Sequence, residues 1–306
     1  MGSLVGKPGN WTVDKIPNLS GKIIIITGAN SGTGFEAARA FAMKNATTIL
    51  ACRSLERGQK ACDQIQNEIP YADLDLIQLD LADMTSIKKF ANDFINKYDH
   101  LDILINNAGI MTPPYGLTKE GFELQFGINH LGHFALTGLL LESILKTKGS
   151  RVVTMSSLTH SIGKIEFEDL HYERKYKPIK AYSQSKLANL LFALELQRKL
   201  EKEGFEVISV AAHPGWAGTN ILRKDGILQY FNKLLGMKPE QGALSLIFAA
   251  VAEKVVGGAY YGPNGLKEIR GYPGVSKIAP GAKDQKVAKR LWEVSENLSG
   301  VKYVFN

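Results

Sequence analysis

Apolar runs of strand length alternate with helical segments along most of this chain, and this alternation restricts its fold more than any other feature. The runs are almost continuous in apolar residues, as in strands buried on both faces of a parallel sheet. The predicted strands are residues 22–27, 47–52, 74–80, 102–107, 151–156 and 206–212, with a short one near 259–261. The predicted helices are residues 34–44, 55–69, 84–97, 122–147, 180–203, 239–253 and about 283–297. Such alternation predicts an α/β fold with helices on both faces of the sheet.

Right-handed crossovers make a doubly wound sheet the simplest topology for this pattern. We expect a single Rossmann-type catalytic domain over residues 21–306, with a mostly parallel sheet of about seven strands. Residues 1–20 are polar and rich in Gly, Pro and Asn, and they predict an extended N-terminal arm. Residues 214–238 lose clean periodicity and predict a substrate-loop region. Its apolar side chains fit a substrate wall or ordinary packing equally well; they are Trp216, Tyr230, Phe231, Leu234 and Met237.

The composition is that of an ordinary globular protein. The 306 residues are 44% hydrophobic and 22% charged. The two cysteines, Cys52 and Cys62, form no disulfide framework and fit a reducing compartment. There is neither a membrane span nor a signal-peptide apolar region near the start. We therefore expect a soluble cytoplasmic protein without a membrane partner.

The net charge of +7 raises the possibility of a nucleic-acid partner. A nucleic-acid face would concentrate Lys and Arg in a stripe, often with aromatic residues between them. Here the basic residues are scattered, and residues 197–203 mix both signs as a solvated helix face does. We therefore expect no nucleic-acid partner, although the positive field favours anionic cofactor phosphates.

A glycine-rich turn follows the first predicted strand. The segment TGANSGTG places Gly28, Gly32 and Gly34 between that strand and the next predicted helix. Glycine permits a tight turn close to a pyrophosphate, and the helix N-terminus offers N–H groups to phosphates. Three glycines alone are a weak signal, and a turn without a ligand is the alternative. The position between strand and helix favours a cofactor site. The other loop residues of this candidate site are Asn30, Ser31 and Thr33.

The second predicted strand ends without a carboxylate. NAD sites commonly carry an acidic residue here, which binds the ribose 2′-hydroxyl. This strand ends instead in Ala51, Cys52, Arg53 and Ser54. An acid would repel a 2′-phosphate, whereas the planar guanidinium of Arg53 pairs with one. We therefore expect NADP(H) as the cofactor, with a solvated loop arginine as the alternative.

The pattern Tyr-x-x-x-Lys occurs three times, at residues 115–119, 176–180 and 182–186. Only the third match has a suitable context. The first lies in a turn-like setting, and the second encloses Pro178, which breaks a helix interior. The third opens a long predicted helix, where side chains four residues apart share one face.

Tyr182 and Lys186 together suit proton transfer to or from a carbonyl oxygen. A nearby cation favours the phenolate, so Lys186 is expected to lower the pKa of Tyr182. A third group should polarise the same oxygen, and the strand RVVTMSS delivers Ser156 and Ser157 to its C-terminal end. Open α/β sheets place their ligands at such ends, although two serines there usually form only a turn.

Taken together, these residues resemble the short-chain dehydrogenase/reductase family over nearly the whole chain. The motifs in the family's order are TGANSGTG, Asp80, NNAG at 106–109, Asn129, the paired serines, Tyr182/Lys186 and HPGWAGT at 213–219. Within the family, the chain is similar to the retinol-dehydrogenase-like branch. That similarity lies in LACRS at 50–54, INHLGHF at 128–134 and SKLANLLF at 185–192.

The resemblance implies a role for each matching residue. Tyr182 would be the general acid/base, Lys186 would tune it and hold the nicotinamide ribose, and Ser157 would be the catalytic serine. Asn129 would position a water that leads from Lys186 to solvent. The implied cofactor contacts are Asp80 and Leu81 to adenine, Asn107, Ala108 and Gly109 to the middle of the cofactor, and Pro214, Gly215 and Thr219 to nicotinamide.

The chain departs from the family pattern in two places, and three of its histidines lie in or near the matching motifs. Thr33 stands where the family usually has Ile, and about a dozen extra residues separate Ser157 from Tyr182, an insertion typical of the retinol-dehydrogenase-like branch. His130 and His133 have no partner cluster for zinc, so we expect no metal. His213 is expected to satisfy a local hydrogen bond.

We expect an NADP(H)-dependent oxidoreductase that interconverts a carbonyl and an alcohol on a fairly apolar small molecule. The N-terminal arm carries no apolar anchor, which favours a carbonyl reductase over a membrane-bound retinoid enzyme. A retinol- or sterol-type alcohol dehydrogenase is the alternative within the class. A catalytically silent NADP(H)-binding regulatory protein is the alternative outside it. The family resemblance also implies a homodimer or homotetramer.

Overall fold

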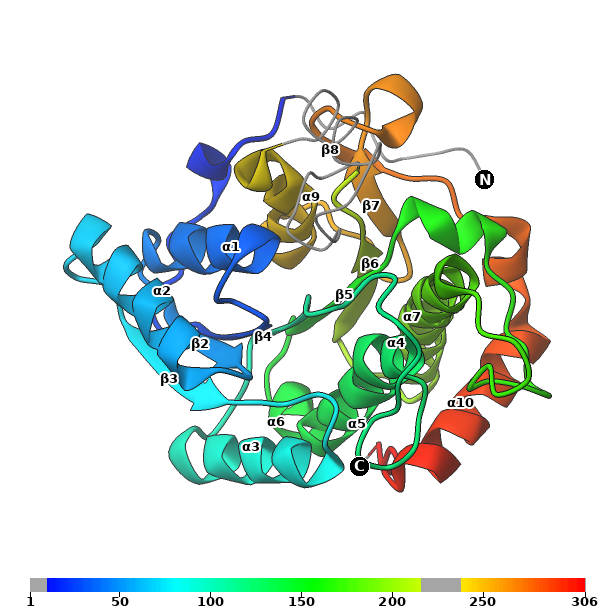
Figure 1. Cartoon of the computed structure of the whole chain (residues 1–306). Helices are drawn as coiled ribbons and strands as arrows, with labels where there is room; N and C mark the ends of the chain where they lie inside the picture. Colours follow the sequence, from blue (N-terminus) through cyan, green and yellow to red (C-terminus); the bar gives the residue numbers. More distant parts are fainter. Residues whose placement is uncertain (1–9, 216–237, 306) are drawn as a thin grey trace.

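The chain folds around one eight-stranded sheet with the strand order β3-β2-β1-β4-β5-β6-β7-β8 (Figure 1). The computed structural model describes residues 10–215 and 238–305. Strands β1 to β7 are parallel, and only β8 runs antiparallel, against β7. The strands are β1 Ile23–Thr27, β2 Thr47–Cys52, β3 Leu74–Gln78, β4 Ile103–Asn106, β5 Arg151–Met155, β6 Ile208–Ala212, β7 Tyr260–Pro263 and β8 Pro273–Val275. The predicted doubly wound α/β fold is confirmed, with β8 as an addition to the seven expected strands.

Strand β1 shows why the apolar runs become buried strands. Its side chains alternate between the two faces of the sheet, as strand geometry requires. Ile23 and Ile25 enter the hydrophobic core on one face, and Ile24 and Ile26 enter the core on the other. A strand with apolar partners on both faces needs no polar alternation, which explains the continuous apolar run.

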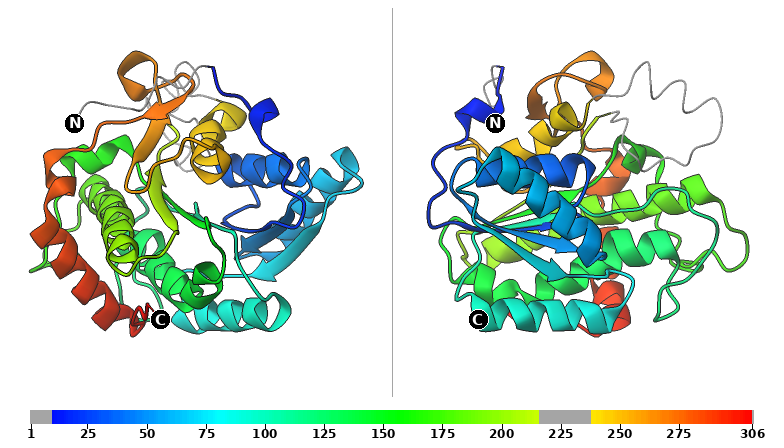
Figure 2. Two further views of the ribbon diagram at one scale, coloured as in Figure 1. Left: turned by 180° about the vertical axis from the view of Figure 1, so that it is seen from behind. Right: turned by 60° about the vertical axis from the view of Figure 1, so that its left-hand side comes forward.

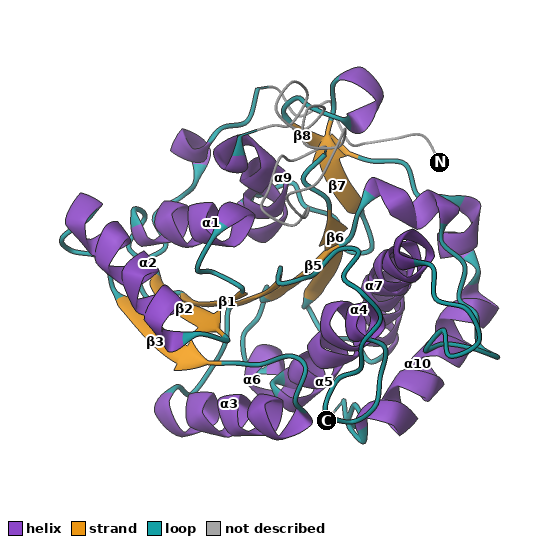
Figure 3. Ribbon diagram, viewed as in Figure 1, coloured by secondary structure: helices purple, strands orange, loops and turns teal. Residues whose placement is uncertain are grey.

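Helices cover both faces of the sheet, as Figures 2 and 3 show. One core lies between the sheet and α1 Gly32–Ala42, α2 Leu55–Glu68 and α9 Pro239–Val251. The other core lies under α3 Met84–Lys97, α5 Gly132–Leu139 and α7 Pro178–Lys202. Helix α10, Gln285–Ser299, packs on the outer side of α7, which explains why α7 is buried nearly all round.

The strand order changes direction between β1 and β4. From β1 the chain winds outward to β2 and β3, and from β4 it winds the other way to β5, β6 and β7. The helices that follow β1 and β4 therefore lie on opposite faces of the sheet, and open α/β sheets bind ligands at the carboxyl ends of the strands at such a point. Every predicted catalytic residue lies in a loop or helix that follows one of these strands.

The helix predicted over residues 122–147 is broken into shorter pieces. It consists of α4 Leu124–Phe126, the π-helical turn η2 Gly127–Leu131, α5 and α6 Leu141–Leu145. A π turn holds one more residue per turn than an α-helix, and such turns are frequent at functional sites. The predicted helical segment is therefore confirmed from Leu124 to Leu145, with a π turn that contains Asn129 and an interruption at Leu140.

The described part of the expected N-terminal arm packs against the domain. Trp11, Ile16 and Leu19 are buried in the core on the α1 and α9 side. The Trp11 ring meets the ring of Phe248 on α9 edge to face, with 5.3 Å between centroids. Residues 10–20 of the expected arm therefore pack on the domain, because three apolar side chains of this polar stretch are buried there.

No helix of residues 10–215 and 238–305 is long and apolar enough to cross a membrane.

We predict that Trp11→Ala lowers the unfolding free energy by about 3 kcal/mol, because it leaves a cavity beside Phe248. Urea unfolding followed by circular dichroism measures this loss. Val13→Ala is the control, since Val13 is only half-buried, and should cost less than about 1 kcal/mol. Equal midpoints for Trp11→Ala and the wild type would show that the arm does not contribute to the core.

Candidate active site

The turn after β1 is folded too tightly for side chains at its glycines. Gly28 has φ +67° and Gly32 has φ +59°, in the left-handed region that favours glycine. A Cβ at Gly34 would lie 2.5 Å from Nδ2 of Asn107 and 2.6 Å from the carbonyl oxygen of Gly28. The loop after β4 therefore packs directly on the glycine turn, and only a bare backbone fits between them.

The N-terminus of α1 suits a phosphate ligand. Its N-cap residue Ser31 makes no side-chain capping bond, and its first turn contains no acidic residue. By contrast, the side chains of Ser54, Asp83 and Asp284 cap α2, α3 and α10. Among the described helices, α1 thus keeps first-turn N–H groups without a side-chain cap beside the glycine turn, as cofactor phosphates require.

Thr33 takes a specific place in this loop. Its hydroxyl donates to Oδ1 of Asn107 at 2.8 Å, and Nδ2 of Asn107 donates to the carbonyl of Thr27 at 2.9 Å. The residue that departs from the family pattern therefore fixes the side chain of Asn107 between β1 and β4. Asn30 lies half-buried in the same turn.

Arg53 follows β2 on the surface, beside the glycine turn. The backbone carbonyl of Arg53 accepts from Nε2 of Gln78 at 3.2 Å, which fixes the start of the loop. Ser54 uses its hydroxyl to accept from the N–H of Arg57 at 3.3 Å and so caps α2. Within the described residues the guanidinium of Arg53 forms no ion pair, and it is free to pair with a phosphate.

Asp80 and Leu81 follow β3, which lies at one edge of the sheet. Oδ1 of Asp80 accepts from the N–H of Ala82 at 3.0 Å, and its own N–H donates to the hydroxyl of Ser86 at 2.9 Å. Its second carboxylate oxygen has no partner among the described residues and suits an amino group such as that of adenine. Leu81 is buried against Gly132.

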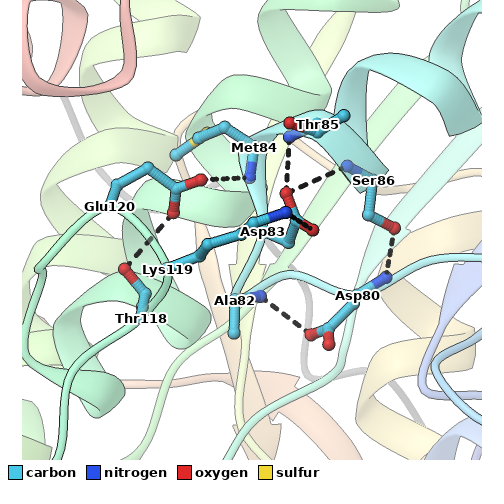
Figure 4. A network of polar contacts seen from close by, with 9 residues as sticks. All are labelled: Asp80, Ala82, Asp83, Met84, Thr85, Ser86, Thr118, Lys119 and Glu120. Atoms are coloured by element: carbon cyan, nitrogen blue, oxygen red, sulfur yellow. Dashed lines mark hydrogen bonds and ion pairs between the residues drawn. The ribbon is translucent and has the colours of Figure 1, made fainter.

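A polar network that the sequence did not reveal supports this loop (Figure 4). Asp83 caps α3 through the N–H of Thr85 at 2.8 Å and pairs with Lys119 at 2.9 Å. Glu120 accepts from the N–H of Met84 at 2.7 Å. Lys119 and Glu120 each lie 36 residues from their partners Asp83 and Met84, so no local signal predicts these two contacts.

Tyr182 and Lys186 lie one turn apart near the start of α7, as predicted. Both are buried, and Nζ of Lys186 lies 5.8 Å from the centre of the Tyr182 ring. Nζ donates to the carbonyl of Met155 at 3.1 Å, and Nδ2 of Asn189 donates to the same carbonyl at 2.9 Å. An ammonium can donate three hydrogen bonds, so this buried group retains donors for ribose hydroxyls.

Burial changes the expected electrostatics of this pair. Burial raises the pKa of Tyr182 to about 12, and the interaction with the Ser157 hydroxyl lowers it only in part. Burial lowers the pKa of Lys186 to about 8. The expectation that Lys186 lowers the pKa of Tyr182 is wrong for the protein without cofactor, because desolvation dominates. At neutral pH Tyr182 is a protonated phenol and Lys186 is largely an ammonium.

The two serines after β5 have different surroundings. The hydroxyl of Ser156 is buried and donates to the carbonyl of Lys186 at 2.7 Å, which fastens the strand end to α7. Ser157 is half-buried, and its hydroxyl accepts from the N–H of Thr159 at 3.2 Å. The same hydroxyl interacts with the Tyr182 phenol and lowers its pKa in part. The geometry favours Ser157 as the group that shares a substrate oxygen with Tyr182.

Asn129 sits in the π turn η2 and holds the loop after β4. Its Oδ1 accepts from the N–H of Ile110 at 2.8 Å, and its Nδ2 donates to the carbonyl of Ile110 at 3.0 Å and to the hydroxyl of Ser185 at 3.0 Å. A Cβ at Gly109 would lie 3.1 Å from Oδ1 of Asn129 and 3.4 Å from Nζ of Lys186. The backbone at Ala108 and Gly109 therefore lies close to Lys186. The predicted water path from Lys186 through Asn129 to solvent stays a prediction.

Gln125 makes further hydrogen bonds to the loop after β4, and the sequence did not reveal this role. It is fully buried, accepts from the N–H of Thr112 at 2.8 Å, and donates to Tyr176 and to the carbonyl of Pro178 at 3.0 Å each. It thereby joins the loop after β4, the end of the insertion and the first residue of α7. Its spacing of four from Asn129 is the signal that could have identified it.

His130 and His133 are single buried side chains with separate partners. Nε2 of His133 bonds the hydroxyl of Thr27 at 2.8 Å, and its Nδ1 bonds the carbonyl of Asn129 at 2.9 Å. Nε2 of His130 bonds the hydroxyl of Ser295 at 2.9 Å. Within the described ranges no group of His, Cys, Asp and Glu could hold a metal ion.

Part of the predicted nicotinamide segment is described. Pro214 and Gly215 follow β6, and Gly215 has φ +72°. The other residues predicted for this segment lie outside the described residues: Thr219 and the apolar side chains Trp216, Tyr230, Phe231, Leu234 and Met237.

Residues 22–226 match a protein-family model described as short chain dehydrogenase. Two curated relatives cover most of the chain. Retinol dehydrogenase 13 of Homo sapiens is 42% identical over 295 residues, which span 92% of this chain and 86% of that protein. Retinol dehydrogenase 11 of Mus musculus is 39% identical over 288 residues, which span 92% and 88%.

Solved structures share the fold. A crystal structure of an uncharacterized protein from Mycobacterium paratuberculosis superposes with a TM-score of 0.82 at 38% identity, over 97% of this chain and all of that one (100%). A short chain dehydrogenase from Shigella flexneri, complexed with NADP, has a TM-score of 0.62 at 21% identity, over 80% of this chain and 98% of that one.

We predict that NADPH binds more weakly as the pH rises through about 8. Below that pH Lys186 is an ammonium, and above it the neutral amine loses its charge-assisted bonds to the ribose. Calorimetric titration between about pH 6.5 and 9.5 measures this dependence. The Lys186→Met variant should bind weakly at every pH without this slope. An identical slope in that variant would assign the dependence to another group.

Proposed function

The chain belongs to the short-chain dehydrogenase/reductase family, and we propose that it is an NADP(H)-dependent oxidoreductase that interconverts a carbonyl and an alcohol on a fairly apolar small molecule. The observation that carries this proposal is the buried pair of Tyr182 and Lys186 beside Ser157, at the same sheet edge as the glycine turn. It is an oxidoreductase of the class that acts on CH–OH groups, homologous to retinol dehydrogenases.

The side chains act on the substrate oxygen and on the proton. In reduction, Tyr182 donates its phenolic proton to the carbonyl oxygen, and the Ser157 hydroxyl donates a hydrogen bond to the same oxygen. When bound, the nicotinamide supplies the hydride in reduction and accepts it in oxidation. Lys186 holds the ribose and places positive charge near the phenolate that forms. The reverse sequence oxidises the alcohol, with Tyr182 as the base.

Three observations support NADP(H) over NAD(H). The surface guanidinium of Arg53 lies after β2, where NAD enzymes carry a carboxylate for the ribose hydroxyl. The net charge of +7 favours a ligand with an additional phosphate. The Shigella flexneri structure of the same fold is complexed with NADP.

The proposal favours reduction of a ketone or aldehyde in the cytoplasm. A phenol whose pKa lies at about 12 is protonated at neutral pH, the form that reduction of a carbonyl requires. The free buried cysteines fit a reducing compartment, where NADPH dominates. The printed names of the relatives favour a second candidate, oxidation of a retinol- or sterol-type alcohol.

We predict that Arg53→Ala raises the Kd of NADPH about 10- to 100-fold, the loss of a charge-assisted bidentate contact. The Kd of NADH should change by less than about twofold, because NADH lacks the 2′-phosphate. Lys60→Ala, which removes an exposed charge paired with Glu56 on α2, is the control. Fluorescence titration with both cofactors measures the effect. Equal weakening of NADPH and NADH would remove Arg53 from the phosphate site.

We predict that Tyr182→Phe abolishes NADPH-dependent reduction of aryl ketones, aldehydes and retinal but leaves the Kd of NADPH unchanged. General acid catalysis accounts for about 10²- to 10⁴-fold in rate, so the expected loss is of that size or larger. Tyr98→Phe is the control, since that phenol bonds Asp75 far from the site. Unchanged turnover in Tyr182→Phe would remove the mechanism. A wild type that binds NADPH tightly but turns over no carbonyl or alcohol would support the regulatory alternative.

A further inference from the structure

Two buried histidines lie next to the catalytic residues but take no part in the chemistry described above. His160 is 4% exposed and His213 is fully buried. Both pack on the ring of Tyr260 in β7, with centroid distances of 5.2 Å for His160 and 4.9 Å for His213. Buried imidazoles cost desolvation energy, so each needs specific hydrogen-bond partners.

His160 links the catalytic serine to a segment near the C-terminus. It lies in the short helix η3 Leu158–Ile162, which follows Ser157 directly. Its Nδ1 lies 2.7 Å from the carbonyl oxygen of Ser157, and its Nε2 accepts from the N–H of Ala279 at 3.2 Å. A backbone N–H can only donate, so Nε2 is unprotonated and the proton sits on Nδ1. Burial also lowers the pKa of His160.

His213 links the predicted nicotinamide turn to the same segment. It follows β6, and its Nδ1 accepts from the N–H of Gly215 at 3.1 Å. Its Nε2 lies 2.9 Å from the hydroxyl of Ser276 and 3.5 Å from a carboxylate oxygen of Glu268. Since Nδ1 accepts, the proton sits on Nε2, which is the opposite tautomer to that of His160.

The segment Ser276–Ala279 is itself held firmly. The N–H of Ser276 donates to the carbonyl of Tyr260 at 2.7 Å, and the N–H of Lys277 donates to Glu268 at 3.1 Å. Glu268 has φ +60°, a strained conformation for a residue with a side chain. Gly262 in β7 leaves room for the imidazole, because a Cβ there would lie 1.8 Å from Nε2 of His213.

We propose that His160 and His213 are positioning residues, neutral and of opposite tautomer, that anchor the two halves of the active site to Ser276–Ala279. His160 fixes the backbone of Ser157 and so aims its hydroxyl at the substrate oxygen. His213 fixes the Pro214–Gly215 turn and so orients the cofactor. This inference rests on the proposed function for Ser157 and for the nicotinamide turn.

The test separates the two roles. His160→Leu removes both bonds and should lower kcat about 10- to 100-fold, the effect of misplacing a catalytic group by about 1 Å, with little change in the Kd of NADPH. His213→Leu should raise the Kd of NADPH roughly tenfold, as expected when the turn loses its acceptor. Asn at either position should restore part of the loss. At 160 its amide nitrogen donates to Ser157, and at 213 its amide oxygen accepts from Gly215.

His171→Leu is the matched control. Nδ1 of His171 accepts from the N–H of Glu123 at 3.3 Å, and its ring stacks on Phe122 with 5.5 Å between centroids, but it contacts neither Ser157 nor Gly215. His171→Leu should lower the free energy of unfolding and leave kcat and the Kd of NADPH unchanged. If all three Leu variants shift kcat and Kd equally, the two histidines are only structural and the proposal is overturned.

Nitrogen-15 NMR of the wild-type protein without cofactor tests the tautomers independently of turnover. We expect the proton on Nδ1 of His160 and on Nε2 of His213. The same tautomer at both, or a charged ring at neutral pH, would overturn the proposal even in an active enzyme. A protein could show opposite tautomers and the expected Kd shift in His213→Leu but turn over no carbonyl. That result would support the anchoring role of the two histidines and contradict the proposed function.

Discussion

The hydroxyl of Thr27 is the contact on which the whole site depends. Thr27 ends β1, and its oxygen accepts from the N–H groups of Asn107 at 3.0 Å and Ala108 at 2.9 Å. The same oxygen bonds His133, whose other nitrogen bonds the carbonyl of Asn129. One buried oxygen thus joins the loop after β4 to the π turn. The parallel sheet makes this possible because it brings the carboxyl ends of β1 and β4 to one edge.

Burial sets the chemistry at this edge. Removing Tyr182 and Lys186 from water disfavours the charged form of each, so the phenol keeps its proton and the lysine holds its proton less firmly. The hydrogen bond to the carbonyl of Met155 offsets part of the desolvation cost of the buried ammonium. The Ser157 hydroxyl likewise offsets part of the cost of a buried phenolate. The same desolvation strengthens every hydrogen bond to a substrate oxygen, because water does not compete for it.

The sequence predicted the elements well and their long-range contacts poorly. The predicted strand at 47–52 coincides with β2, because a run buried on both faces is apolar throughout. Strand β8 escaped prediction because its three residues, Pro273–Val275, include Pro and Gly and owe their place to pairing with β7. The sequence also placed Tyr182 and Lys186 on one helix, whereas their depth of burial, which reverses the expected pKa shift of Tyr182, depends on the whole fold.

The late position of residues 276–279 in the chain has a consequence for biosynthesis. Ribosomes release a chain from its N-terminus, and folding begins on what has emerged. The glycine turn, the π turn and the start of α7 all lie before residue 190, whereas His160 and His213 meet their anchors only when Ser276 and Ala279 appear. A nascent chain would therefore contain both histidines well before their anchors exist. Chains that stall before residue 276 would lack the anchors of both turns at once, the turn after Ser157 and the Pro214–Gly215 turn.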